Sequence, residues 1–231
     1  ATDKMRDFMF RAAFPDDVVR AKQENKHAVY MTGNGVPLPH NFLTAEEELA
    51  YIKIFFQLGI RMMHVTYNRR NLIGDGCAET ANGGLSDFGR MVIKEMNKVG
   101  VIPDVSHSGW QTSLETIQLS EKPAVVSHSV VASLNRVIRS KPDEVIKALA
   151  DKDSYMGICV VPRFLGGTGD IAQMMRHIDY VVKKFGSRHV AIATDVAYWS
   201  QYANKEWEKI NELSQRRANS SGASWETLWA D

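Results

Sequence analysis

Short apolar runs alternate with longer amphipathic segments along most of the chain. The runs that we assign to strands are residues 27–32, 61–66, 102–106, 124–127, 155–161 and 190–194. Several of them are apolar almost without interruption, which is typical of parallel strands buried on both faces. Segments with helical periodicity lie at 44–58, 86–99, 108–119, 142–150, 170–185 and 205–216, and a further one at 15–25 precedes the first strand. This alternation predicts six parallel βα units.

Local signals at the helix ends support these boundaries. Thr44 and Glu47 have the spacing of a capping box, and Gly59, Gly100 and Gly186 follow three of the helical segments as stops. Six parallel strands fit either an open doubly wound sheet or an incomplete eight-stranded barrel. Neither a Gly-x-Gly-x-x-Gly run nor a Walker loop follows any strand, which weakens the nucleotide-binding interpretation of an open sheet.

Composition narrows the class of protein without identifying it. The 231 residues suffice for one sizeable core, and 44% hydrophobic with 24% charged residues is ordinary for a globular protein. A net charge of +1 gives no reason to expect a nucleic-acid partner, and no apolar stretch approaches the length of a membrane span. We therefore expect a single domain over residues 1–231. The first residues lack the apolar core of a signal peptide. The cellular compartment of the protein stays open, and so does the possibility of a homo-oligomer.

Polar side chains that can bind metal stand at the ends of three predicted strands. His107 follows the third strand, His128 the fourth and Asp195 the sixth. The carboxyl ends of parallel barrel strands meet at one mouth, where active sites are built. Because imidazole and carboxylate are the usual ligands of catalytic zinc, the pattern favours a metal-dependent hydrolase.

An ordered set of short motifs resembles the membrane (renal) dipeptidase family. The motifs are QLGIRMMHVTYN at 57–68, GLSDFG at 84–89, MN at 96–97, DVSH at 104–107, KPAVVSHS at 122–129, RSKPD at 139–143, HIDY at 177–180 and HVAIATD at 189–195. They follow the family's order and spacing over about residues 15 to 200. Each motif alone is weak, whereas the set is specific.

The resemblance implies a TIM-type (β/α)8 barrel that binds two zinc ions and hydrolyses a small dipeptide-like substrate. The six strands would be the third to the eighth, so that this chain would lack the first two. By position, His107 and His128 resemble the pair that holds one zinc. Asp195 resembles the acidic residue near the other metal, which handles the proton between water and leaving amine. Arg139 resembles the residue that pairs with the substrate carboxylate, a task suited to a planar guanidinium.

The chain departs from the family pattern at three places. The family's His-x-Asp pair on the first strand has no counterpart before residue 15, and the one such pair, His177 with Asp179, falls on a helix and is interpreted as structural. The family's bridging Glu falls at Gly33 or Asn34, and Asn34 could offer a neutral oxygen to metal or substrate. A substrate-contacting His of the family falls at Tyr67, whose phenol can still donate a hydrogen bond to a developing oxyanion.

Other candidate ligands are weaker. Cys77 lies in the loop after the second strand, where its thiolate could replace a missing ligand, but a structural role is the simpler interpretation. His27, His40, His64 and His189 have no spacing that suggests a site.

Three functions stay open at this point. The first is a zinc-dependent dipeptidase-like hydrolase, the second a catalytically degenerate, non-enzymatic relative, and the third an unrelated open-sheet binding protein. With two histidines for one ion and at most Asp195 for the other, we expect one zinc or none to be retained and dipeptidase turnover to be weak or absent.

Overall fold

The structure, a computed structural model, describes residues 5–38 and 44–195, together with 208 and 212. The strands are β1 (Met9–Arg11), β2 (His27–Val29), β3 (Met31–Gly33), β4 (Ile60–His64), β5 (Ile102–Asp104), β6 (Val126–Ser129), β7 (Met156–Cys159) and β8 (Val190–Ala193). The helices are α1 (Pro15–Gln23), α2 (Ala45–Gln57), α3 (Asp87–Val99), α4 (Trp110–Leu119), α5 (Asp143–Asp151), α6 (Pro162–Leu165) and α7 (Ile171–Phe185), with a 3₁₀ turn η2 (Ser187–His189). Apart from 208 and 212, the helix predicted at 205–216 lies outside the described residues.

Six of the strands follow one another in chain order, as the sequence predicts. β3, β4 and β5 form one parallel sheet, and β6, β7 and β8 form another. A parallel bridge between Asp104 and Val125 joins the two, with the N–H of Val105 donating to the carbonyl of Val125 at 2.9 Å. Among the described residues the sheets do not close into a barrel, and β3 and β8 are the outer strands.

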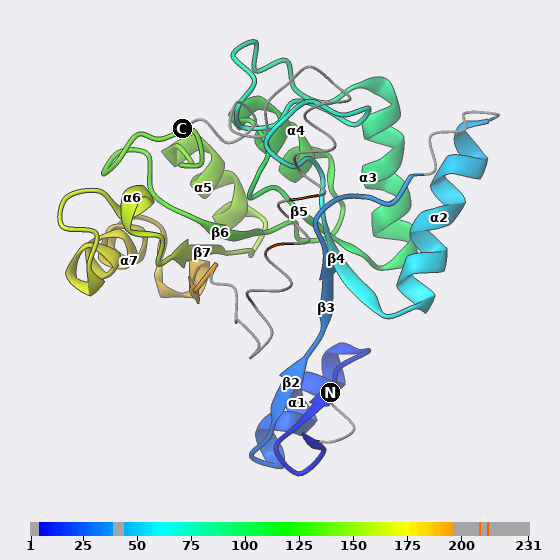
Figure 1. Ribbon diagram of the computed structural model, residues 1–231, viewed down its shortest axis with the longest axis horizontal. Helices are drawn as coiled ribbons and strands as arrows, with labels where there is room; N and C mark the ends of the chain where they lie inside the picture. Colours follow the sequence, from blue (N-terminus) through cyan, green and yellow to red (C-terminus); the bar gives the residue numbers. More distant parts are fainter. Residues whose placement is uncertain (1–4, 39–43, 196–207, 209–211, 213–231) are drawn as a thin grey trace.

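Capping side chains and glycines set the helix limits. Thr44 Oγ1 accepts a hydrogen bond from the N–H of Glu47 at the start of α2, and Ser86 Oγ accepts one from Gly89 at the start of α3. α3 ends at Gly100, whose φ of 96° favours glycine. Neighbouring helices pack in the order α2, α3, α4, α5, α7, on the outside of the strands (Figure 1). None of the described helices is long and apolar enough to cross a bilayer.

The core lies between these helices and the strands. Its fully buried members include Met63, Val126, Met156 and Ile158 from four successive strands. Burying an apolar side chain of this size stabilises the fold by about 1.5–3 kcal/mol. Because the strands are parallel neighbours, their carboxyl ends lie together at one edge of the fold.

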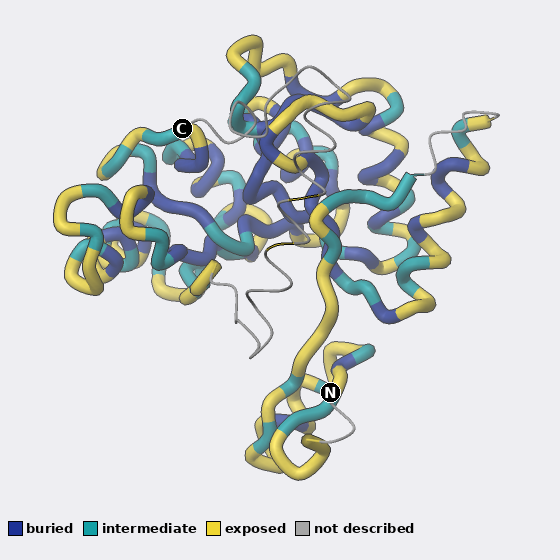
Figure 2. Tube along the Cα trace, viewed as in Figure 1, coloured by how far each residue is buried: buried dark blue, intermediate teal, exposed yellow. Residues whose placement is uncertain are grey.

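The first predicted strand, at 27–32, is wrong as a single element. It divides into β2 and β3, and β2 pairs in parallel with β1, which the sequence analysis did not predict. Figure 1 shows the β1–α1–β2 unit apart from the rest, connected through β3, and Figure 2 shows that most of its residues are exposed or partly exposed. β1 and β2 are three residues long and contain no buried residue, unlike the strands of the core.

Candidate metal centre

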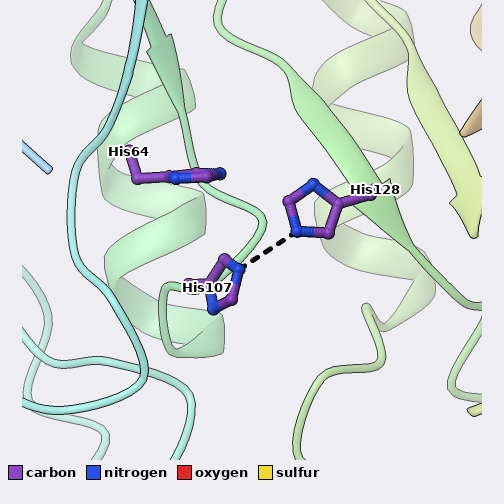
Figure 3. A group of neighbouring side chains, drawn as sticks. All are labelled: His64, His107 and His128. Atoms are coloured by element: carbon purple, nitrogen blue, oxygen red, sulfur yellow. Dashed lines mark hydrogen bonds between the residues drawn. The ribbon is translucent and has the colours of Figure 1, made fainter. Parts of the chain in front are cut away.

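Three histidines from three adjacent strands converge at the carboxyl edge of the sheet. His64 is the last residue of β4, His107 follows β5 by three residues, and His128 lies in β6. Their ring centroids are 4.9 to 5.4 Å apart, and the rings stand nearly edge-on to one another (Figure 3). One possible ligand atom from each lies within 4.8 Å of the other two, so the three can reach one metal ion.

The Nε2 atoms of His107 and His128 are 3.0 Å apart. Two nitrogens that bind one tetrahedral zinc at about 2.0–2.1 Å are themselves about 3.3 Å apart. The observed spacing is therefore close to that of two ligands on one ion, and a small rotation of either ring would make it so.

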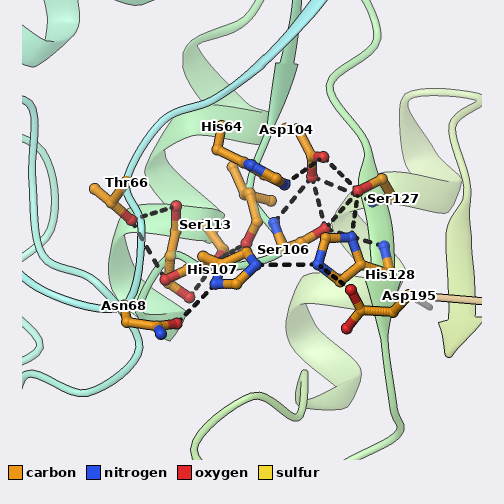
Figure 4. Close-up of polar contacts among 12 residues, drawn as sticks. His64, Thr66, Asn68, Asp104, Ser106, His107, Ser113, Ser127, His128 and Asp195 are labelled. Carbon is orange, nitrogen blue, oxygen red and sulfur yellow. Dashed lines mark hydrogen bonds and ion pairs between the residues drawn. The ribbon is translucent and has the colours of Figure 1, made fainter. Parts of the chain in front are cut away.

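The partner of His107 Nδ1 assigns the tautomer of this ring. Nδ1 lies 2.7 Å from Oδ1 of Asn68, an oxygen that can only accept, so Nδ1 carries the proton and Nε2 carries the lone pair (Figure 4). Asn68 is buried and has a φ of 59°, a left-handed conformation that is unusual outside glycine. Asparagine adopts this conformation more readily than most residues, and its buried side chain holds the His107 ring in one orientation, as the outer partners of metal-binding histidines do.

A second chain of hydrogen bonds assigns the tautomer of His128. Ser127 Oγ donates to the carboxylate of Asp104 in a short contact and lies 2.8 Å from Nδ1 of His128. Since the hydroxyl has one proton and gives it to Asp104, it must accept from Nδ1 of His128, whose Nε2 then carries the lone pair. Burial opposes ionisation of Asp104, but its contacts with His64, Ser127 and Ser106 hold its pKa well below the usual range. The carboxylate at the end of this chain is thus charged.

Both facing nitrogens therefore present lone pairs to the same point. Burial lowers the pKa of His107 well below its usual range, and the charge of Arg139 lowers it further. Burial also lowers the pKa of His128 to about 4, against the opposing charge of Asp195. Both imidazoles are neutral at pH 7, the form in which histidine binds metal. Two lone pairs at this distance repel unless a cation lies between them.

His64 completes the cluster, although its spacing in the sequence suggests no site. Its Nε2 lies 3.0 Å from Oδ2 of Asp104, the distance of an ion pair, but the ring orientation is not that of a hydrogen bond. The residue is 5% exposed, and neither ring nitrogen has a hydrogen-bond partner among the described residues. Apart from this contact with Asp104, neither nitrogen of the buried ring is satisfied by a described residue. That state is costly, and a metal ion would satisfy one of the two nitrogens. His64 lies inside the strand predicted at 61–66, so no polar strand end marked it. β4 instead ends at His64, and this end lies beside those that carry His107 and His128.

Asp195 lies next to the cluster, at the end of β8. Its Oδ1 is 3.7 Å from Nε2 of His128, and its side chain is 32% exposed. Its φ is 50°, again in the left-handed region. The carboxylate is therefore close enough to exchange a proton with a group bound between the histidines, and open enough to meet a substrate.

Arg139 is buried, although it follows β6 in a loop where an arginine is ordinarily exposed to solvent. The residue is 6% exposed, and its guanidinium carbon lies 5.5 Å from the ring centroid of Phe164. Its Nε has no hydrogen-bond partner in the part of the chain that the structure describes. No carboxylate of the described residues forms an ion pair with it. Because an unpaired buried charge is unfavourable, this guanidinium is suited to receive an anion.

The two other predicted substrate contacts differ from each other. Tyr67 stacks on His107, with ring centroids 4.0 Å apart and an angle of 20° between the planes, and burial raises the pKa of its phenol. It is therefore beside the cluster as a neutral hydrogen-bond donor. Asn34 lies in an exposed bend after β3, and no contact among the described residues joins it to the histidines.

His177 and Cys77 have contacts typical of structural residues. His177 is buried on α7, with Nδ1 accepting from the N–H of Val131 and Nε2 donating to the carbonyl of Leu165, both at 3.1 Å. Burial raises the pKa of the Cys77 thiol, which disfavours the thiolate that a metal would need. Its N–H donates to the carbonyl of His107 at 2.9 Å, so Cys77 helps to hold that loop.

A protein-family model decides to which family the chain is related. The model of the membrane dipeptidases, peptidase family M19, matches residues 2–215. The chain belongs to this family. The resemblance seen in the sequence motifs is thereby confirmed, and the α/β fold with parallel sheets agrees with it.

Individual relatives agree with the membership of this chain in family M19. An amidohydrolase from Pseudomonas aeruginosa is 33% identical, with a TM-score of 0.76 over 89% of this chain and 62% of that one. A metallo peptidase from Rhodobacter sphaeroides, solved with a phosphinate mimic of the dipeptide L-Ala-D-Ala, has a TM-score of 0.73 at 18% identity over 91% and 64% of the two chains, and shows the fold alone. Dipeptidase aclJ from Aspergillus oryzae is 29% identical over 62% of this chain and 36% of its own length. The chain thus spans about a third to two thirds of the relatives it matches.

Proposed function

We propose that this protein is a metal-dependent hydrolase that cleaves a dipeptide or a related amide and uses one zinc ion held by His64, His107 and His128. The observation that carries the proposal is the convergence of the three rings at the ends of β4, β5 and β6, with ligand atoms within 4.8 Å of one another. Membership of family M19 supports the hydrolase class. We also propose that the two sheets belong to a (β/α)8 barrel, which the described strands do not close.

The donor set suits one zinc rather than two. Three histidines leave the fourth position of a tetrahedral site open, as catalytic zinc sites do. A second ion would need ligands at the position of the family's bridging Glu, where Gly33 and exposed Asn34 stand. The finding of His64 in the cluster raises the ligand number for the first ion from the two that the sequence suggested to three, and removes the main reason to expect negligible metal affinity.

The surrounding residues fit the steps of amide hydrolysis. Zinc bound there would supply Lewis acidity and lower the pKa of a water molecule. Asp195 would accept a proton from the attacking water and deliver it to the amine as the C–N bond breaks. Arg139 would bind the substrate carboxylate, and the Tyr67 phenol would donate a hydrogen bond to the oxygen on which negative charge develops.

The test is a hydrolysis assay of the 231-residue chain against a panel of dipeptides, with zinc and with a chelator. The account predicts chelator-sensitive turnover that is lost in His107→Ala and kept in His27→Ala, a histidine that lies on exposed strand β2. Absence of turnover in the zinc-loaded chain would contradict it and favour a catalytically degenerate relative.

A further inference from the structure

A second feature of the same edge of the fold is a cavity of about 830 Å³. Its lining comes from the segments that follow four successive strands: Cys77 and Glu79 after β4, Trp110 after β5, Arg136 after β6, and Arg163 and Phe164 after β7. These segments follow the carboxyl ends of the strands, where the histidine cluster also lies. The hydrogen bond from Cys77 to the carbonyl of His107 connects the cavity wall to the cluster directly.

The cavity wall carries two arginines without a carboxylate partner. The guanidinium carbon of Arg136 lies 5.1 Å from the ring centroid of Trp110, and that of Arg163 lies 5.0 Å from the ring centroid of Phe164. Both side chains are exposed, and neither forms an ion pair with a described residue. Cation–π contact holds each guanidinium against a wall while its donors stay available.

The remaining charge on the wall does not neutralise the pair. Glu79 is the acidic residue of the lining, and its Oε1 accepts a hydrogen bond from the backbone N–H of Arg70 at 3.0 Å. Trp110 is fixed in place because its Nε1 donates to the carbonyl of Ser140 at 2.8 Å. The cavity is therefore a partly rigid, net positive space with two planar donor groups.

The position of Arg139 relates the cavity to the substrate. Arg139 packs on Phe164, a residue of the cavity wall, and Ser140, which anchors Trp110, is its neighbour in the chain. Arg139 does not itself line the cavity, but its contact with Phe164 brings it beside the wall. If Arg139 binds the α-carboxylate, as the proposed function has it, the side chain of the substrate's carboxy-terminal residue is the part that can enter the cavity. Guanidinium groups in this place favour a side chain that carries its own carboxylate, which they can bind in bidentate fashion.

We propose that the cavity selects substrates whose carboxy-terminal residue is acidic, with Arg136 and Arg163 binding the side-chain carboxylate while Arg139 binds the α-carboxylate. The inference rests on the proposed function only for the role of Arg139 and for the bond that is cleaved. Arg136 and Arg163 are specificity-determining residues in this account, and recognition of the second carboxylate does not need the metal.

The test is a binding measurement by calorimetry on the full chain, treated with chelator so that no hydrolysis occurs. The probes are Ala-Glu, with glutamate in both configurations, its neutral isostere Ala-Gln, and the reversed dipeptide Glu-Ala. We expect one configuration of Ala-Glu to bind about tenfold more tightly than Ala-Gln at low salt, with a smaller difference at high salt. The double variant R136Q/R163Q should bind the two equally.

Arg188→Gln is the matched control, because Arg188 is an exposed arginine paired with Asp153 and lies outside the cavity. It should keep the preference. Equal binding of Ala-Glu and Ala-Gln by the wild type, no binding of either, or a preference that survives in R136Q/R163Q would each overturn the inference. Tighter binding of Glu-Ala than of Ala-Glu would overturn the placement of the acidic residue. Zinc-dependent hydrolysis without a preference for Ala-Glu over Ala-Gln would leave the proposed function intact and refute this inference alone. A preference for Ala-Glu without any hydrolysis would support this inference and contradict the proposed function.

Discussion

Lys141 is a fully buried lysine whose replacement tests the electrostatics of this fold. Its side chain is 0% exposed, and its Nζ donates to the carbonyl of Ser108 at 2.6 Å and to Ser113 Oγ at 3.0 Å. No carboxylate of the described residues pairs with it. Burial lowers the pKa of Lys141 to about 7 from its ordinary 10.5.

The lowered pKa makes stability depend on pH in a definite direction. Between about pH 7 and pH 10.5 the unfolded chain binds the Lys141 proton and the folded chain does not, so raising the pH stabilises the folded state. Each pH unit in this range contributes up to about 1.4 kcal/mol. From pH 6.5 to pH 8.5 the contribution of Lys141 to the free energy of unfolding should rise by roughly 2 kcal/mol.

Urea denaturation at these two pH values, followed by tryptophan fluorescence, measures the effect. The pH dependence of the wild type minus that of Lys141→Met isolates the contribution of Lys141. Lys147→Met is the control, since it removes the same charge from an exposed position on α5, and it should keep the wild-type dependence. If the wild type and Lys141→Met change in parallel between pH 6.5 and 8.5, the reasoning about this buried lysine is wrong.

Two other substitutions probe the sheet and the support of the cluster. Gly157→Ala should destabilise the fold by about 1–3 kcal/mol, because its Cβ would lie 2.0 Å from the carbonyl oxygen of Ser127 on β6. Thermal denaturation measures the effect, with Gly35→Ala as the control because a Cβ there meets nothing within 4 Å. Equal melting temperatures of the two variants would contradict the prediction. Asn68→Gly keeps the left-handed backbone but removes the partner of His107 Nδ1, so zinc affinity should fall about 10- to 100-fold. Asn68→Asp keeps an acceptor and should retain zinc affinity. Indistinguishable zinc affinities of Asn68→Gly and Asn68→Asp in a titration would refute the role of Asn68 in orienting His107.

Strand order and the main chemistry could be predicted because they leave local patterns. Apolar runs located the six βα units, and a polar residue at a strand end was enough to find His107 and His128. β1 was missed because it is three residues long. The division of 27–32 into β2 and β3 could not be predicted, because it follows from the pairing of β2 with β1.

The third histidine was missed for a different reason. His64 ends an apolar strand without a polar neighbour, and only the parallel register of β4 with β5, which pairs His64 with Asp104, brings it to the others. Similarly, nothing in the sequence distinguishes a buried Arg139 from an exposed Arg136. Burial of this kind depends on packing between loops that are far apart in the chain.

Zinc binding by the chelator-treated chain tests the central claim most directly. Equilibrium dialysis with metal analysis gives both stoichiometry and affinity, for the wild type and for His64→Gln, with His27→Gln as the control on an exposed strand. The account predicts one zinc per chain in the wild type and in His27→Gln, and a large loss of affinity in His64→Gln. A wild type that binds no zinc, or a His64→Gln variant that binds it as tightly as the wild type, would contradict the three-histidine site.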